Sequence, residues 1–215
     1  MSLCPIKYLS STFFDRPTEV VARNLLGKML VRILFTKLGK TERLSGIIVE
    51  TEAYGSKNDP ASHAYRGISP RNVSMFGQVG RAYIYFTYGN HYCLNVCARS
   101  NRLEAGAVLI RALEPVEGIG RMEIFRKSND VFSLTSGPGK LTEALDITRR
   151  FDGEDMTNPQ NILHIEHGLD PSNVVKTARI GISRALNKKW RFVIGGEIEG
   201  RLSKYASRRT YRHFD

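Results

Sequence analysis

One short segment of the sequence places two carboxylates beside an aromatic ring. Residues 47–54 read Ile-Ile-Val-Glu-Thr-Glu-Ala-Tyr, and their β-branched and aromatic types favour a strand. Because strand side chains alternate between faces, Glu50, Glu52 and Tyr54 share one face, and a more apolar set faces the core. A carboxylate on such a half-buried face can act as a general base beside a ring-shaped substrate. The alternative is an exposed face with two solvated glutamates.

A charged residue interrupts a second apolar run. Arg111 lies inside Val-Leu-Ile-Arg-Ala-Leu, within a strand predicted over residues 107–113. A buried guanidinium needs a carboxylate partner, because burying it alone is costly. Glu50 or Glu52 could be that partner, which would bring two distant segments together. Asn95 could supply a side-chain amide to the same site.

A predicted β-hairpin carries a group of tyrosines. Two β-rich runs flank Gly89 and the asparagine that follows it, and a Gly-Asn pair in this context favours a tight turn. Tyr83 and Tyr85 share one face of the first run, and Tyr88 lies at the turn itself. An aromatic side chain at an exposed tip of a basic protein suggests a wedge that enters a base stack. Ordinary packing in the core is the alternative, and it is the one favoured for Phe86.

Residues 55–80 contain many Gly, Pro, Ser, Asn and Arg residues and little periodicity, which predicts a long loop. Loops of that length are uncommon unless they are functional. His63 lies in this loop, although a lone loop histidine is more often a surface residue than a catalytic one. The sequence contains no dinucleotide-binding fingerprint, no Ser-His-Asp elbow and no set of metal ligands. The expected chemistry is therefore acid–base work with no metal and no cofactor.

The charge of the chain points to an acidic partner. The 215 residues carry a formal net charge of +11, with an isoelectric point near 9.8. Nucleic acid is the first expectation for a domain this basic, and basic residues occur along the whole chain. No apolar run reaches membrane-spanning length and no secretory signal is recognisable. We therefore expect a protein that does not associate with a membrane and is not secreted. An intracellular location follows, in the nucleus of a eukaryote or the cytoplasm and nucleoid of a prokaryote.

The order of the predicted elements favours an α+β fold. We predict a single compact domain over residues 1–215, acting as a monomer, around a curved, largely antiparallel sheet with a protruding β-hairpin and flanking helices. We expect residues 196–215 to be a basic C-terminal tail. The other predicted elements are helices at 15–27 and 115–127, and strands at 29–35, 46–54, 162–165, 177–183 and 190–194.

Nine short motifs follow one another over about residues 11–195. They are Ala22–Lys28, Val49–Tyr54, Asp59–Ala64, Pro70–Asn72, Met75–Phe76, Ala82–Gly89, Asn90–Asn95, Leu109–Pro115 and Ser136–Pro138. Each is weak alone, but the ordered set resembles the alkyladenine or 3-methyladenine DNA glycosylase family. The resemblance implies a base-excision-repair enzyme that flips alkylated or deaminated purines out of double-stranded DNA and hydrolyses the N-glycosidic bond, leaving an abasic site.

The resemblance also implies roles for particular residues. Glu52 would be the general base that activates the attacking water, and Arg111 and Asn95 would help to hold the water and the base pocket. The family pattern indicates no nucleophilic lysine, so no covalent intermediate and no strand nicking are expected.

Aromatic side chains would hold the flipped base. Tyr54 would stack on one face of the base, with His63 and Tyr85 on the other and Tyr83 supporting the pocket. Tyr88 would fill the gap left in the DNA stack. The alternative to this enzyme is a non-catalytic nucleic-acid-binding module that stacks bases on its tyrosines.

Overall fold

The computed structural model describes residues 8–36, 39–87, 89 and 91–195. The predicted wedge residue Tyr88 and the predicted tail at 196–215 lie outside the described residues. None of the helices in the described ranges is long and apolar enough to span a bilayer.

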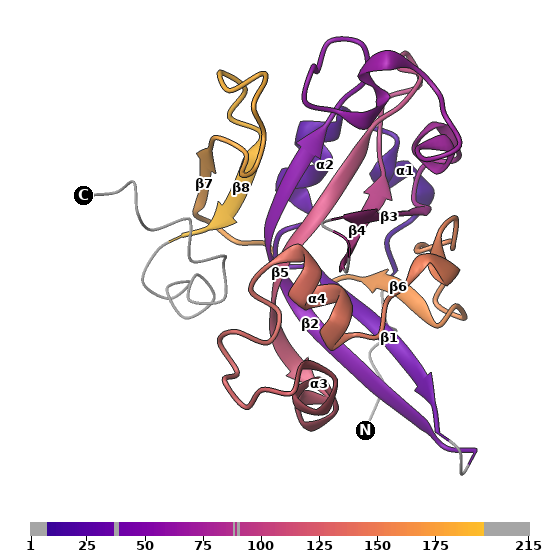
Figure 1. Cartoon of the computed structure of the whole chain (residues 1–215), viewed down its shortest axis with the longest axis vertical. Helices are drawn as coiled ribbons and strands as arrows, with labels where there is room; N and C mark the ends of the chain where they lie inside the picture. Colours follow the sequence, from indigo (N-terminus) through magenta and orange to yellow (C-terminus); the bar gives the residue numbers. More distant parts are fainter. Residues whose placement is uncertain (1–7, 37–38, 88, 90, 196–215) are drawn as a thin grey trace.

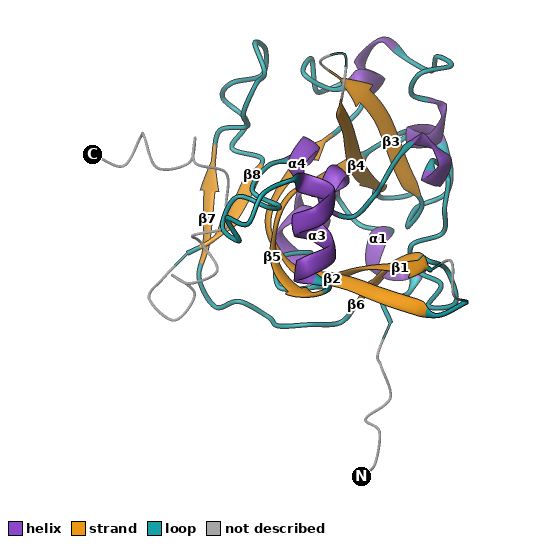
Figure 2. Cartoon of the chain, turned by 60° about the horizontal axis from the view of Figure 1, so that its bottom comes forward, coloured by secondary structure: helices purple, strands orange, loops and turns teal. Residues whose placement is uncertain are grey.

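The described strands form one sheet. They are β1 (Met29–Phe35), β2 (Thr41–Tyr54), β3 (Ala82–Thr87), β4 (His91–Cys97), β5 (Ala107–Glu117), β6 (Leu163–Glu166), β7 (Val174–Thr177) and β8 (Arg191–Ile194). Their order is β3-β4-β5-β2-β1-β6, β8 pairs with both β2 and β7, and the pairings are antiparallel. Figures 1 and 2 show how strongly the sheet curls. The predicted α+β fold around a curved, largely antiparallel sheet is confirmed.

Short helices cover the sheet. They are α1 (Ser11–Phe14), α2 (Thr18–Asn24), α3 (Ile119–Arg126) and α4 (Pro138–Ala144), with 3₁₀ turns η1 (His63–Arg66), η2 (Val73–Phe76) and η3 (Arg149–Phe151). In Figure 1, α4 lies in front of the sheet, and it packs on β4 and β5 with α3 beside it. One buried apolar core joins the helices to the sheet. It contains Val21 of α2, Ile110 of β5 and Leu141 of α4.

The predicted helix at 15–27 is wrong in its extent. The helical residues of α2 run only from Thr18 to Asn24, and Pro17 is the residue that precedes its first turn. Proline has no N–H, and it disfavours helical geometry in the residue before it. Asp15 therefore does not cap this helix and follows the separate short helix α1 instead.

The predicted helix at 115–127 starts too early. β5 continues to Glu117 because it pairs with β2, which also begins earlier than predicted, and Ser45 lies opposite Glu117. Gly118 ends the strand at φ 73°, and a Cβ there would lie 2.9 Å from the carbonyl oxygen of Arg43. Only glycine fits that position without strain. The helix α3 begins at the next residue.

The middle of the sheet is built around β2. Its first half pairs with β1 through residues 41–47, and its second half pairs with β8 through residues 50–52. The opposite edge of β2 pairs with β5 along residues 45–54. The second half of β2, where the two glutamates lie, is therefore hydrogen-bonded on both edges.

Candidate active site

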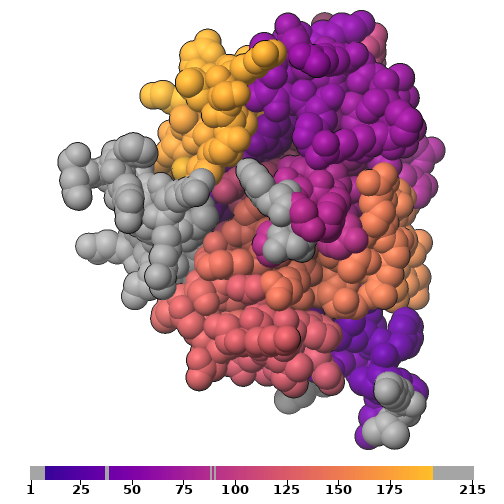
Figure 3. All heavy atoms as spheres, in the orientation of Figure 1, coloured from indigo at the N-terminus to yellow at the C-terminus, as the bar shows by residue number. Residues whose placement is uncertain are grey.

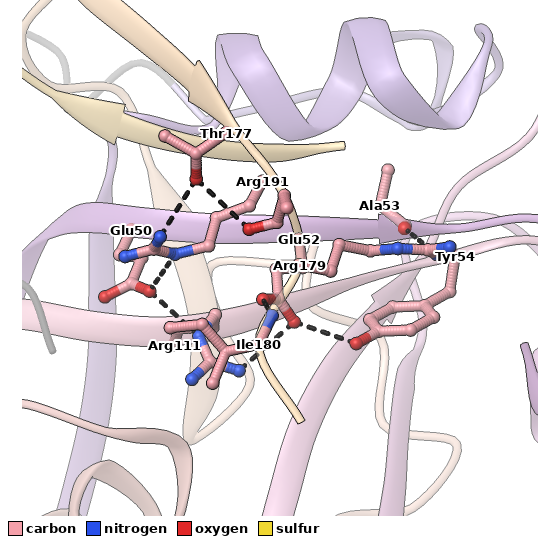
Figure 4. A network of polar contacts seen from close by, with 10 residues as sticks. Glu50, Glu52, Ala53, Tyr54, Arg111, Thr177, Arg179, Ile180 and Arg191 are labelled. Atoms are coloured by element: carbon pink, nitrogen blue, oxygen red, sulfur yellow. Dashed lines mark hydrogen bonds and ion pairs between the residues drawn. The ribbon is translucent and has the colours of Figure 1, made fainter. Parts of the chain in front are cut away.

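Glu52 is fully buried in the second half of β2, between β5 and β8. Three donors bind its carboxylate, as Figure 4 shows. Oε2 accepts from the Tyr54 hydroxyl at 2.8 Å and from Arg111 Nη1 at 3.1 Å, and Oε1 accepts from the backbone N–H of Ile180 at 2.7 Å. These bonds fix the direction in which the carboxylate points.

Arg111 joins the two glutamates of β2. Its Nε donates to Glu50 Oε1 at 2.9 Å while its Nη1 reaches Glu52, so both residues are its partners, where the sequence left one or the other open. Arg191 on β8 adds a second guanidinium, with Nε 2.6 Å from Glu50 Oε1. Burial alone would lower the pKa of Arg111, but the charges of Glu52 and Glu50 outweigh it and raise that pKa. The buried charges therefore compensate one another.

Both glutamates lie on the site face, although the strand pairing around them is irregular. The register between β2 and β5 shifts between Ile48 and Glu50 and again between Glu50 and Thr51. Thr51 points the other way and donates its hydroxyl to the Ala22 carbonyl oxygen of α2, 2.7 Å away. Ile48 lies in the apolar core, not beside the glutamates as strict alternation would place it, because a bulge changes the facing of the residues before it.

An aromatic wall stands beside the carboxylates. His63 Nδ1 lies 2.9 Å from the Tyr83 hydroxyl oxygen, and the His63 ring meets the Tyr85 ring edge-on, with centroids 4.6 Å apart. The rings of Tyr83 and Tyr85 are 5.6 Å apart and lie on one face of β3. His63 remains exposed, so part of this wall is open to an incoming ring.

Two side chains of the site, His63 and Tyr54, are uncharged at pH 7. Partial burial of the imidazole lowers the pKa of His63, and the charge of Arg71 lowers it further, so the ring is neutral at pH 7. Burial and the negative charge of Glu52 raise the pKa of Tyr54 well above 10.0, so its hydroxyl stays protonated and donates to Glu52.

Asn95 lies opposite Tyr83 in the hairpin formed by β3 and β4. Its Nδ2 donates to the Tyr83 carbonyl oxygen at 3.0 Å and to the Cys93 carbonyl oxygen at 3.4 Å. With its nitrogen bound to the backbone, the amide oxygen is the atom that Asn95 can offer to a ligand.

A pocket of about 210 Å³ opens between these groups. Its lining includes most of the predicted site residues, namely Tyr54, His63, Tyr83, Tyr85, Asn95 and Arg111. Glu52 lies directly behind the lining, because the three residues that bind its carboxylate all line the pocket. Figure 3 shows two contributing segments, the loop at 55–80 and the chain at 178–190, beside each other on one face.

The sequence matches the family model described as methylpurine-DNA glycosylase over residues 12–198. The chain belongs to this family. Membership confirms the predicted family and the predicted enzyme class, a DNA glycosylase. The match covers nearly the whole span over which the ordered motifs occur.

Relatives of similar length support membership of the methylpurine-DNA glycosylase family. A protein of Koribacter versatilis is 41% identical over 199 residues, covering 91% of this chain and 93% of the relative. One of Prosthecochloris aestuarii is 45% identical over 181 residues, covering 83% and 84%. One of Methanoculleus marisnigri is 42% identical over 205 residues, covering 94% and 99%. All three are provisionally named 3-methyladenine DNA glycosylases.

Two residues beside the site were not predicted from the sequence. Asp59 and Arg179 are both buried and form a bidentate ion pair, with both N···O distances 2.7 Å. The predicted strand at 177–183 is wrong, because β7 ends at Thr177 and the chain then turns toward β2. Arg179 has an apolar residue on either side, Ala178 and Ile180, but it does not lie within a long apolar run such as the one that identified Arg111.

Basic side chains line a groove next to the pocket. Arg66, Arg71 and Arg184 are exposed there, and the groove shares His63 and Gly181 with the pocket lining. Arg71 Nη2 also donates to the Phe86 carbonyl oxygen at 3.3 Å. Phosphate oxygens are natural partners for such arginines.

The prediction that Phe86 fills the core is wrong. Phe86 is 45% exposed, and its ring contacts Tyr92 across the hairpin with centroids 5.1 Å apart. It lies near the end of β3, where the hairpin extends past the main core.

Proposed function

We propose that this chain excises alkylated or deaminated purines from double-stranded DNA as a monomer, using a water activated by Glu52. The observation that carries the proposal is the position of the Glu52 carboxylate, fully buried directly behind an aromatic pocket. A simple stacking surface gains nothing from a negative charge held there. A buried carboxylate with fixed geometry is what water activation requires.

The hydrogen bonds of Glu52 leave room for a water molecule. A carboxylate has about four acceptor positions, and three are used by Tyr54, Arg111 and Ile180. The remaining position is on Oε1, which accepts the Ile180 N–H alone among the residues that the structure describes. Arg111 and the Asn95 amide oxygen lie in the same pocket lining and would orient the water.

The reaction needs no further reagent. As the bond between C1′ and the purine nitrogen breaks, its electron pair leaves with the base. An alkylated cationic purine departs neutral, whereas a neutral deaminated purine departs as an anion and takes up a proton from solvent. Water oxygen bonds to C1′, and Glu52 takes the proton. The negative carboxylate also stabilises the positive charge that develops on the sugar, as in glycoside hydrolysis.

The aromatic wall fits an electron-poor ring. Tyr54 would stack on one face of the flipped base, and His63 and Tyr85 would contact the other. Each cation–π contact with a positively charged purine contributes about 0.5–2 kcal/mol. Flipping a base costs a few kcal/mol, and Tyr88 stays the predicted wedge that fills the vacated space.

The test is base release, wild type beside Glu52→Gln. The substrates are dimethyl-sulfate-treated duplex DNA, which carries methylated adenine and guanine, and a duplex with one hypoxanthine. We expect wild type to release methylated purines and leave abasic sites that break only with hot alkali. Loss of the general base should lower the rate about 10²–10⁴-fold, while affinity for the damaged duplex is kept.

Two outcomes contradict the proposal. Full activity of Glu52→Gln would remove Glu52 as the base. Tight, salt-sensitive binding by wild type with no release from either substrate would favour the non-catalytic binding module.

A further inference from the structure

Arg179 lies where three segments of the pocket wall meet. Its Nη1 donates to the carbonyl oxygen of Ala53 at 2.9 Å. Ala53 is the residue between Glu52 and Tyr54 on β2. Both of its Nη atoms bind Asp59, and the guanidinium is fully buried. These contacts tie the chain at 178–182 to the end of β2.

Asp59 connects the same ion pair to the loop of His63. Its Oδ2 accepts the Gly55 N–H at 3.0 Å, and its backbone carbonyl accepts the Ser62 N–H at 2.9 Å. Ser62 in turn donates its hydroxyl to the Gly55 carbonyl oxygen at 2.5 Å and precedes η1, which begins at His63. Asp59 thus sets the path by which the loop reaches the aromatic wall.

Arg179 also supports two groups of the site directly. Its neighbour Ile180 donates the N–H that holds Glu52 Oε1. Its guanidinium carbon lies 4.6 Å from the centroid of the Tyr54 ring. Tyr54 lines the pocket and Arg179 does not, so the guanidinium backs the ring on the side away from the pocket.

We propose that Arg179, held by Asp59, is a positioning residue for base release, which rests on the proposed function above. It touches neither base nor water. Through Ile180 it sets the direction of the Glu52 carboxylate, and through its contact with the ring it holds Tyr54 where a base would stack. Removing it should therefore slow the bond-breaking step and leave the DNA-binding surface intact.

The pair is tested with Arg179→Met and with the double variant Arg179→Met/Asp59→Asn. The single variant leaves the Asp59 charge buried without its cation, which is strongly destabilising, whereas removing both charges of a buried pair is often neutral for stability. With enzyme in excess over dimethyl-sulfate-treated duplex, we expect the folded double variant to release methylated purines about 10²-fold more slowly, the loss typical of a small misplacement of catalytic groups. Affinity for a duplex with a tetrahydrofuran abasic analogue should stay within about threefold, because phosphate contacts supply it.

A physical readout accompanies the rate. Trp190 is the single tryptophan of the chain, and its ring centroid lies 5.5 Å from the Arg179 guanidinium carbon. Its emission should therefore change in both variants. In Arg179→Lys, which keeps a cation for Asp59, part of the base-release rate should return.

The control is Arg43→Met, which breaks ion pairs with Glu166 and Glu117 at the other end of β2. It should lower stability with no change in base release. If wild type releases methylated purines and the double variant releases them equally fast, the positioning role is overturned and the proposed function still stands. No release by wild type would instead overturn the proposed function.

Discussion

The Tyr54 hydroxyl donates to Glu52 Oε2 across 2.8 Å, from two positions further along the same strand. One side chain therefore combines two tasks. Its ring lines the pocket, and its hydroxyl holds the carboxylate behind the pocket. Two substitutions separate these tasks.

Tyr54→Phe keeps the ring and removes the donor. We expect affinity for a duplex with one hypoxanthine to stay near wild type, because stacking remains. The release rate should fall roughly 10-fold, the effect of losing one hydrogen bond to a charged group. Tyr54→Leu removes both and should weaken affinity as well. Equal affinities for Phe and Leu variants would show that the ring does not stack on the base.

The protonation of His63 should make the choice of lesion depend on pH. Burial and Arg71 lower its pKa from 6.5, so the ring is neutral above that pH and gains charge only on further acidification. An imidazolium repels a cationic methylated purine more than neutral hypoxanthine. Between about pH 5 and 8, the ratio of methylpurine to hypoxanthine release should fall toward the acid end.

The control for this prediction is His63→Phe, which keeps an aromatic ring without a titrating group. Its ratio of the two release rates should vary less with pH than that of wild type. The same acid fall in both proteins would assign the effect to another group.

Glu166 on β6 provides a prediction about stability. Burial opposes its ionisation, but hydrogen bonds from His164 and Arg43 prevail and lower its pKa to about 2 from 4.5. A lowered carboxyl pKa stabilises the folded protein above the unfolded value and loses that effect as pH falls toward the folded one. Glu166→Gln should therefore lower the free energy of unfolding at pH 7 by about 2 kcal/mol.

Urea denaturation at several pH values checks this. The difference between wild type and Glu166→Gln should shrink from about pH 4.5 toward pH 2, the window between the unfolded and folded values. A difference that is constant with pH would mean that Glu166 acts through packing and not through its charge.

Local patterns in the sequence predicted much of the arrangement of the site residues. Alternation along one strand placed Glu50, Glu52 and Tyr54 on one face, and the need of Arg111 for a carboxylate linked β5 to β2. Both relationships depend on neighbours in a sheet, which follow from strand patterns. The position of His63 in the pocket followed from the family resemblance, not from any periodicity, whereas Asn95 was assigned to the site both from its amide side chain and from the resemblance.

The contacts that could not be predicted from the sequence are those that depend on the path of the backbone. The contact between Ile180 and Glu52 uses a backbone N–H, which has no residue type to identify it. The Asp59–Arg179 pair joins segments 120 positions apart, and it forms because the chain leaves the strand after Thr177. The bulges in β2 also escaped prediction, since no side-chain pattern marks them.

The two halves of the site differ in how the sheet holds them. Glu52 lies in a strand with strand partners on both edges, whereas Tyr83 and Tyr85 lie on β3, a strand at one end of the sheet order. Among the described residues, the outer edge of β3 has no strand partner and bonds to the loop at 152–154 through Ala82 and Ile84. Amide protons near Glu52 should therefore exchange with solvent only through large-scale opening, and those of β3 through small, frequent fluctuations. In the proposed reaction, the aromatic wall would yield to an entering nucleotide while the carboxylate stays in place.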